Sequence, residues 1–133
     1  MDINGNSKEL LLKDLCSRLP YGVKVCAGFN TGNRYNAEIT AISLDRDYVQ
    51  IRQNDLHPYT GSSIEDIRPY LRTMSSMTEE EENKYNSLNA YNGGIFPSTE
   101  DAFDWLNEHH FDYRGLIEKG LALEASEGMY KTE

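Results

Sequence analysis

The sequence predicts an α+β fold, in which an N-terminal helix is followed by a small antiparallel β-barrel and then by C-terminal helices. The spacing of apolar residues indicates this order. They recur at helical intervals before Pro20 and after Thr73, whereas between Gly22 and Arg72 they alternate with polar residues, as in short strands. A chain of 133 residues, of which 38% are hydrophobic, can bury a core without disulfide or metal staples.

Charge divides the chain into two parts. Residues 1–73 hold 9 lysines and arginines and 9 aspartates and glutamates, whereas residues 74–133 hold 4 and 13. The second part therefore carries the whole net charge of −9. We expect a helix-plus-barrel unit at 1–73 and an acidic helical region at 74–133 that packs on it. The acidic part is a poor candidate for binding a phosphate backbone.

The first predicted element is a short helix that ends at Pro20, with Ser7 as its N-cap. Its apolar side is marked by three leucines spaced four residues apart: Leu11, Leu15 and Leu19. Its opposite, polar side carries Lys8, Asp14 and Arg18. We therefore expect the leucines to be buried and the three charged residues to face solvent.

Short strands are predicted at residues 23–25, 37–41 and 48–52, where apolar and polar positions alternate. The segment 44–47 is a hairpin candidate, and 54–61 forms a further connection. A helical turn and a closing strand follow, with Ile64, Ile67 and Leu71 turned inward. This arrangement is typical of an SH3-like barrel, an analogy that concerns the fold and carries no function.

Two capping boxes predict the helices of the acidic part. In the first, Ser76 caps a helix whose third residue is Glu79, and the acidic run 79–82 then lies in its first turns, where the helix dipole favours acids. In the second, Ser98 is the cap and Asp101 the acid. The run 79–82 has an alternative interpretation as an acidic recognition segment.

A third short helix is expected at residues 112–119, with Gly120 as the residue that follows its end. Leu121, Leu123 and Ala125 predict a closing extended segment that packs back on the rest. We expect the final stretch, residues 126–133, to fray.

Three stretches carry a resemblance to known sequences: residues 14–25, residues 67–80 and residues 104–117. They resemble a group of small uncharacterised proteins encoded in phage-like and mobile-element regions of gut anaerobic bacteria. The similarity spans both ends of the chain and is weaker over residues 27–63. It implies a genomic setting but assigns no catalytic residue.

The densest group of reactive side chains lies at residues 109–114, and His109, His110 and Asp112 are its catalytic candidates. A histidine oriented by a carboxylate can act as a general acid or base. A metal site is a weaker alternative, because adjacent helical residues point about 100° apart. The third interpretation is structural: the histidines end a helix and Asp112 caps the next one. The sequence predicts no metal site and no cofactor, and the two cysteines are expected to be reduced, partly buried thiols.

Aromatic and basic residues are interleaved in the predicted barrel. The binding candidates among them are Tyr35, Tyr48, Arg52, Tyr59, Arg68 and Tyr70. Aromatic rings beside guanidinium groups can stack on peptides or on single-stranded bases, although many tyrosines in a small sheet serve packing.

The leading functional hypothesis is a non-enzymatic intracellular adaptor or regulator that acts on a protein partner of unknown identity. One alternative is a nucleic-acid-associated module, which the acidic charge disfavours, and another is a small enzyme centred on residues 109–112. No apolar run is long enough to span a bilayer and the first residues do not have the pattern of a signal peptide, so we expect no membrane association and a cytoplasmic location.

Overall fold

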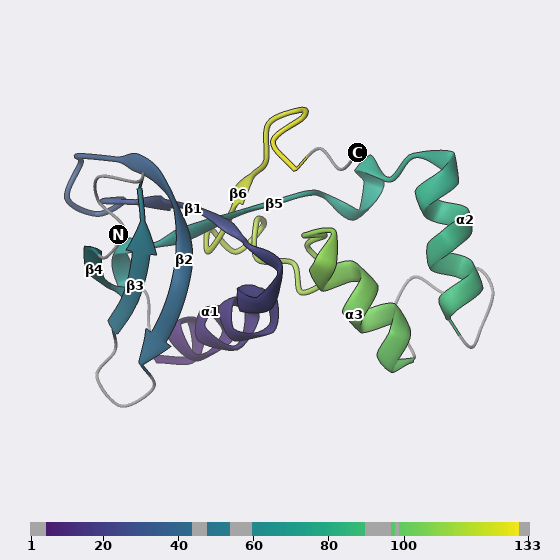
Figure 1. The fold of residues 1–133 in the computed structure, drawn as a ribbon, viewed down its shortest axis with the longest axis horizontal. Helices are drawn as coiled ribbons and strands as arrows, with labels where there is room; N and C mark the ends of the chain where they lie inside the picture. The colour runs from purple at the N-terminus through teal and green to yellow at the C-terminus, as the bar shows by residue number, and fades with distance from the viewer. Residues whose placement is uncertain (1–4, 44–47, 54–59, 90–96, 98, 131–133) are drawn as a thin grey trace.

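The computed structural model describes residues 5–43, 48–53, 60–89, 97 and 99–130, and these have the predicted α+β class (Figure 1). In the described residues one α-helix precedes all six strands, and two α-helices lie between the fifth and the sixth strand. The α-helices and strands, in chain order, are α1 (Gly5–Arg18), β1 (Lys24–Ala27), β2 (Tyr35–Ser43), β3 (Tyr48–Arg52), β4 (Thr60–Ser63), β5 (Arg68–Leu71), α2 (Glu79–Leu88), α3 (Glu100–Glu108) and β6 (Leu123–Glu124). The proposed hairpin at 44–47 and most of the connection at 54–61 lie outside the described residues.

The strands form one mixed sheet in the order β4-β3-β2-β1-β5-β6. Neighbouring strands are antiparallel except for β5 and β6, which are parallel. The sheet is not closed into a barrel, so the SH3-like barrel that we expected is not confirmed. The sheet stays open because the second edge of β5 is already paired. It pairs with β6, and just beyond β5 an isolated bridge joins Arg72 to Phe111. The edge that could have closed a barrel is therefore already paired.

The main core lies between α1 and one face of the sheet. As predicted, Leu11 and Leu15 of α1 are fully buried, and they belong to the same cluster as the inward residues Val25, Ile39 and Ile51. The helix begins at Gly5, before the expected cap at residue 7. Because alternate residues of a strand point to opposite faces, the other sheet face carries the polar positions.

The acidic part contributes to both of the hydrophobic clusters found in the described residues. Leu116 and Leu121 complete the main core. A second, smaller cluster forms between α2 and α3 around Tyr85, Trp105 and Phe111. In Figure 1 these two helices lie beyond the end of β5, far from β4. None of the helices in the described ranges combines the length and apolar character that a bilayer crossing requires.

A buried ionic group joins α1 to residues 111–114, and it corrects our expectation that Asp14 and Arg18 face solvent. Both side chains are fully buried. The Arg18 Nε donates to Asp14 Oδ2 at 2.9 Å, and Arg18 Nη2 donates to the Phe111 carbonyl at 2.6 Å. Arg114 Nη1 donates to Asp14 Oδ1 at 2.7 Å. At 3.6 residues per turn the Asp14 and Arg18 side chains lie on the same side of α1 as its buried leucines, and a segment that is distant in sequence covers them there.

Local sequence patterns correctly predicted α2 and α3 but not the residues that cap them. The N-cap of α2 is Thr78, two residues after the expected Ser76, and that of α3 is Thr99. The expected cap Ser98 lies outside the described residues. Residues 112–119 form turns in place of the expected helix. Cys16 is exposed, whereas Cys26 is buried as expected, and both are free thiols.

The buried carboxylate of Asp14 should dominate the stability of this fold. In the variant Asp14→Ala the Arg18 guanidinium stays buried without its counter-ion, so we expect a loss of about 3–5 kcal/mol in the free energy of unfolding. Urea denaturation followed by tryptophan fluorescence measures it. The exposed pair Arg52–Glu38, with 3.8 Å between Nη2 and Oε1, supplies the control. Arg52→Ala should cost about 0–1 kcal/mol, and equal losses in both variants would contradict the assigned role of Asp14.

Candidate functional site

The C-terminal end of α3 separates the two adjacent histidines. His109 is the C-cap, and His110 follows it with a positive φ of 61°, the left-handed conformation usually taken by glycine. The Phe111 N–H donates to the Leu106 carbonyl at 2.9 Å and the His110 N–H to the Asn107 carbonyl at 3.1 Å. These two bonds form a Schellman motif, which ends the helix and sends the imidazoles in different directions.

His109 stays with α3. Its ring Nδ1 lies 2.9 Å from the Trp105 carbonyl oxygen, and the two rings have centroids 4.5 Å apart. The hydrogen bond makes Nδ1 the donor, because a carbonyl oxygen can only accept. His109 is half-buried at the edge of the second cluster.

His110 points into the protein and stacks on a residue near the end of the described chain. Its ring centroid lies 4.0 Å from that of Tyr130, with an angle of 27° between the planes. The side chain is 4% exposed, and burial followed by the nearby Arg18 charge lowers its pKa to about 4. His110 is therefore neutral at pH 7.

Asp112 acts as a cap for the turns that follow it. Its Oδ1 accepts a hydrogen bond from the Leu116 N–H at 2.8 Å, and its Oδ2 accepts one from the Ile117 N–H at 3.0 Å. The three catalytic candidates thus make three separate sets of structural contacts. The described residues also contain no group of three or more His, Cys, Asp or Glu side chains arranged to hold a metal ion.

Two of the binding candidates are exposed on the outer face of the sheet, the face opposite α1. Tyr48 and Arg52 lie two pleats apart on β3, and both are exposed. The ring of Tyr48 lies against Gly61 of β4 so closely that a Cβ there would be 2.3 Å from the ring atom Cε2. Glycine at this position therefore allows the tyrosine to cross the neighbouring strand.

The other binding candidates are dispersed. Tyr35 packs against the main core on the inner face. Arg68 is buried, and its guanidinium donates to the carbonyls of Glu65 at 2.7 Å and Gly120 at 3.1 Å. The Tyr70 hydroxyl donates to Asn36 Oδ1 at 2.7 Å. Tyr59 lies outside the described residues. The described candidates do not form one continuous patch.

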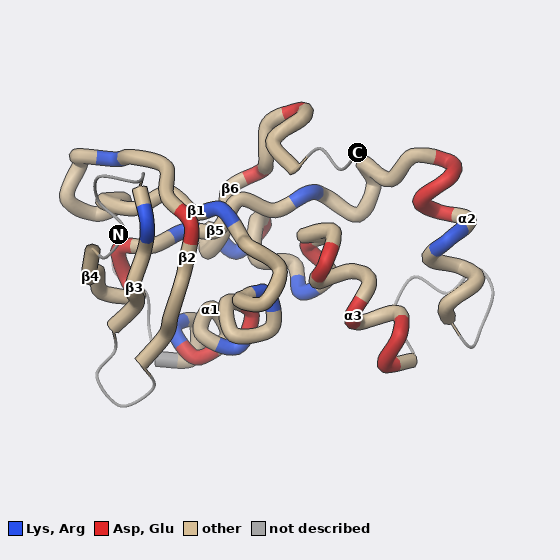
Figure 2. The backbone as a smooth tube through the Cα atoms, viewed as in Figure 1, with Lys and Arg blue, Asp and Glu red and all other residues tan. Residues whose placement is uncertain are grey.

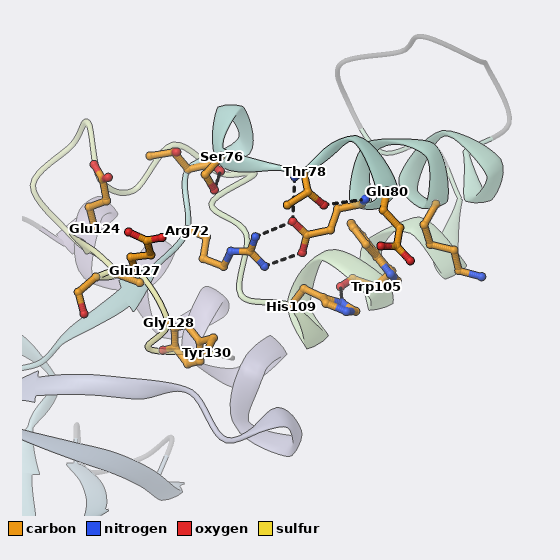
Figure 3. Close-up of a pocket in the computed structure, with 15 residues that line it drawn as sticks. Arg72, Ser76, Thr78, Glu80, Trp105, His109, Glu124, Glu127, Gly128 and Tyr130 are labelled. Carbon is orange, nitrogen blue, oxygen red and sulfur yellow. Dashed lines mark hydrogen bonds and ion pairs between the residues drawn. The ribbon is translucent and has the colours of Figure 1, made fainter. Parts of the chain in front are cut away.

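A groove of about 1180 Å³ lies away from these residues, between α2 and the C-terminal segment, which we define as residues 123–130 (Figure 3). One wall comes from the start of α2, and the opposite wall comes from residues 124–128 together with Tyr130. Arg72, Trp105 and His109 lie between the two walls. The groove thus joins an aromatic surface to polar rims.

The α2 wall is held by Glu81, which makes two sets of contacts. Its carboxylate accepts hydrogen bonds from Arg72 Nη1 at 2.8 Å and Nη2 at 2.7 Å. It also accepts the Thr78 N–H at 3.0 Å, while the Glu81 N–H donates to Thr78 Oγ1, which completes a capping box. The bond from Arg72 is the main cause that lowers the pKa of Glu81. The Arg72 guanidinium also lies 4.2 Å from the centroid of the Phe111 ring.

Carboxylates line both rims of the groove. Glu80 stands on the α2 side, and Glu124 and Glu127 stand on the opposite side (Figure 3). Within the described residues none of these three makes an ion pair. Since the Arg72 charge is neutralised in its own ion pair, Lys84 is the remaining described lysine or arginine of the lining. Figure 2 shows further acidic residues along α3, so the surroundings of the groove are also negative.

Sequence reasoning did not find this groove. None of the predicted binding candidates lies in α2 or α3, and residues 126–133 were expected to fray. The structure corrects the second point for residues 126–130, because Tyr130 is anchored to β1 and β5 by its hydroxyl group. The groove depends on segments some fifty residues apart in sequence, and no local pattern brings them together.

Removal of the Glu81 side chain should uncouple α2 from β5. We expect Glu81→Ala to lower the free energy of unfolding by about 1–3 kcal/mol at pH 7, because it removes a bidentate ion pair and half of a capping box. The difference in free energy of unfolding between the variant and the wild type should shrink as the pH falls below 4.5, the ordinary pKa of glutamate. The wild-type carboxylate is stabilising only while it is ionised. Chemical denaturation at several pH values measures this. The matched variant Glu80→Ala should change stability much less at every pH, and an equal effect would argue against the role of Glu81.

Comparison of this chain with protein-family models, with curated proteins and with solved structures found no match. The residues and geometry described above are therefore the basis for a functional proposal.

Proposed function

We propose that this protein is a non-enzymatic adaptor or regulator that acts through protein contacts, and that the groove is its binding surface. The observation that carries the proposal is the combination of a large groove, aromatic side chains in its lining, and rim carboxylates that make no ion pair with any described residue. Aromatic residues supply much of the binding energy at protein interfaces, and a polar rim provides specificity. The genomic setting implied by the resemblance stays a prediction.

The chemistry of the rims selects the kind of partner. Glu80, Glu124 and Glu127 are unpaired within the described residues, and they face the groove from opposite sides. Charge complementarity therefore favours a protein segment that carries lysine or arginine side chains. The neighbouring rings of Trp105, which is 8% exposed, and His109 are tilted by 31° to each other, and they provide a small apolar surface on which the aliphatic stems of such side chains can pack. Negative charge at the same rims would repel a phosphate backbone.

A basic peptide tests this proposal directly. We expect a short, labelled peptide of alternating lysine and glycine to bind at low salt, and a glutamate–glycine peptide of the same length not to bind. The double variant Glu124→Gln/Glu127→Gln should weaken binding by roughly tenfold, which corresponds to about 1.4 kcal/mol. Fluorescence anisotropy measures both affinities.

A matched variant separates the groove from general charge attraction. Asp104→Asn/Glu108→Gln removes the same charge from exposed positions of α3 that do not line the groove. When both double variants are compared at physiological salt, where the screening length is about 8 Å, this one should change the affinity by less than about twofold. Equal weakening by both double variants would overturn the groove as the binding site. A captured natural partner should form chemical crosslinks to residues 124–128, and crosslinks only to β3 would likewise contradict it.

The outer sheet face supports a second candidate function, a nucleic-acid-associated module. Tyr48 and Arg52 are exposed there on one strand, and Lys24 lies on the same face of β1. Tyrosine rings and guanidinium groups are the groups that stack on unpaired bases. The paired Glu38 carboxylate beside Arg52 reduces the positive charge of this face.

Single-stranded oligonucleotides test the second candidate. If this face binds them, the affinity should fall steeply with salt, and Tyr48→Ala/Arg52→Ala should weaken it by at least about tenfold. The groove variant Glu124→Gln/Glu127→Gln should leave oligonucleotide binding unchanged or slightly stronger. Absence of retention on single-stranded DNA or RNA at low salt, measured by anisotropy, would rule this candidate out.

A further inference from the structure

The wall of the groove formed by the C-terminal segment is attached to the sheet at few points. The Ala125 N–H donates to the Leu71 carbonyl at 2.7 Å, just beyond the short ladder between β5 and β6. At the other end the Tyr130 hydroxyl accepts the Lys24 N–H at 2.8 Å and donates to the Tyr70 carbonyl at 2.7 Å. Residues 126–129 between these points are mostly exposed. Lys24 Nζ also donates to the Met129 carbonyl at 2.8 Å, so Tyr130 is one of two anchors at the far end of this wall.

The Tyr130 anchor rests on His110. The imidazole lies flat against the Tyr130 ring, with 4.0 Å between the centroids. The backbone of His110 has the left-handed conformation, which glycine adopts with less strain than histidine. Glycine would fit this position at the helix end equally well, so the helix end does not explain the imidazole ring. Its visible use is to support the tyrosine.

The surroundings of His110 oppose a positive charge on its ring. The titratable and charged groups near it come from four elements: Asp14 and Arg18 of α1, His109 at the end of α3, Tyr130 of the C-terminal segment and Lys24 of β1, whose Nζ lies 5.8 Å from the Tyr130 ring centroid. The Asp14 carboxylate is already shared by two guanidinium groups, those of Arg18 and Arg114. The buried group thus has a surplus of positive charge before the imidazole is protonated.

Hydrogen bonding gives only partial compensation for such a charge. Within the described residues the His110 Nδ1 is buried and has no hydrogen-bond partner, and the same holds for Arg18 Nη1. A proton on Nδ1 would place an unpaired donor beside an unpaired guanidinium donor. One hydrogen bond to the Tyr21 backbone favours the charged ring, but it is outweighed by burial and by Arg18.

We propose that His110 and Tyr130 form a proton-sensitive latch: the neutral imidazole holds the C-terminal segment on the sheet, and protonation releases that segment and opens one wall of the groove. Release exposes the imidazole to water, where its charge is tolerated. The consequence for partner binding rests on the proposed function of the groove, whereas the latch itself can be measured on the protein alone.

The direction and size of the effect follow from proton linkage. The pKa of His110 is about 4 in the closed state and has an ordinary value of 6.5 once the ring is exposed. The latch is therefore fully stabilised above pH 6.5 and loses stability as the pH falls toward 4. The equilibrium for opening should rise by about 80-fold between pH 6.5 and pH 4, and by up to about 300-fold from pH well above 6.5 to pH well below 4.

Amide hydrogen exchange measured by NMR reports how often the C-terminal segment opens at each of its two attachment points. The reporters are the amides of Lys24 and Ala125, and the amides of Ile39 and Ile51 in the central strands are the internal control. After correction for intrinsic exchange, protection at the reporters should fall between pH 7 and pH 4.5, while protection at the controls stays constant. Unchanged reporters, or controls that lose protection in parallel, would overturn the latch.

Variants assign the effect to His110. His110→Asn and His110→Gly both suit a positive φ, so the helix end is kept, and neither side chain titrates in this range. Both should lose the pH dependence, and His110→Gly should also lower reporter protection at pH 7. Tyr130→Phe keeps the ring but loses two hydrogen bonds, so it should lower protection and keep the pH dependence. In the exchange experiment His109→Asn should show the same reporter protection and the same pH dependence as the wild type. Reporter protection that still depends on pH in His110→Asn would refute the assignment.

The lysine–glycine peptide then separates the two proposals. If the latch opens at low pH and the affinity of the peptide changes with it in the wild type but not in His110→Asn, both proposals are supported. If reporter protection falls while the peptide binds nowhere on the protein at any pH, the latch stands and the proposed function fails. If the peptide binds in the groove while reporter protection does not depend on pH, the proposed function stands and the latch fails.

Discussion

The arrangement of this protein depends on one buried carboxylate, that of Asp14. It accepts hydrogen bonds from Arg18 in its own helix and from Arg114, one hundred residues later in the chain. A buried charge is costly unless it is paired and hydrogen-bonded, so these three residues are stable only when α1 and the segment after α3 are held together. The second bond of Arg18, to the Phe111 carbonyl, fixes the same segment through its backbone. The ionic group therefore specifies which surface of α1 meets the acidic part.

The groove follows from that constraint. Once the backbone of residues 110–112 is held, its polar groups continue the edge of β5: the Arg72 N–H donates to the His110 carbonyl, and the Asp112 N–H donates to the Arg72 carbonyl. These bonds place the Arg72 side chain over the Phe111 ring and within reach of Glu81. One carboxylate then both caps α2 and ties it to the sheet. The aromatic cluster behind Arg72 is covered as a result, with Trp105 remaining at the floor of the groove.

The segment 109–114 illustrates how a dense set of reactive side chains can be explained by structure. His110 supports a tyrosine, Asp112 caps a turn and Arg114 neutralises a buried acid. Each contact satisfies a polar group that would otherwise be unpaired at a helix end or in the interior. The acidic run 79–82 divides in a similar way, since Glu81 has a local and a tertiary partner, whereas Glu80 faces the groove. Within the described residues Glu80 makes no ion pair, so its carboxylate has neither of the structural roles of Glu81.

Residue spacing alone was sufficient for the α+β class, the apolar face of α1, most of the strands and the presence of two acidic helices, because these depend on short-range periodicity and capping. Spacing was misinterpreted for Asp14 and Arg18, because each follows a buried leucine by three residues and so lies on the leucines' side of α1. It was not sufficient for Tyr130, which was expected in a frayed end. Whether a polar residue is buried depends on which distant segment covers it, and that is decided by tertiary packing. The open sheet has the same origin: β5 pairs with β6, a strand from the far end of the chain, and no local pattern identifies that partner.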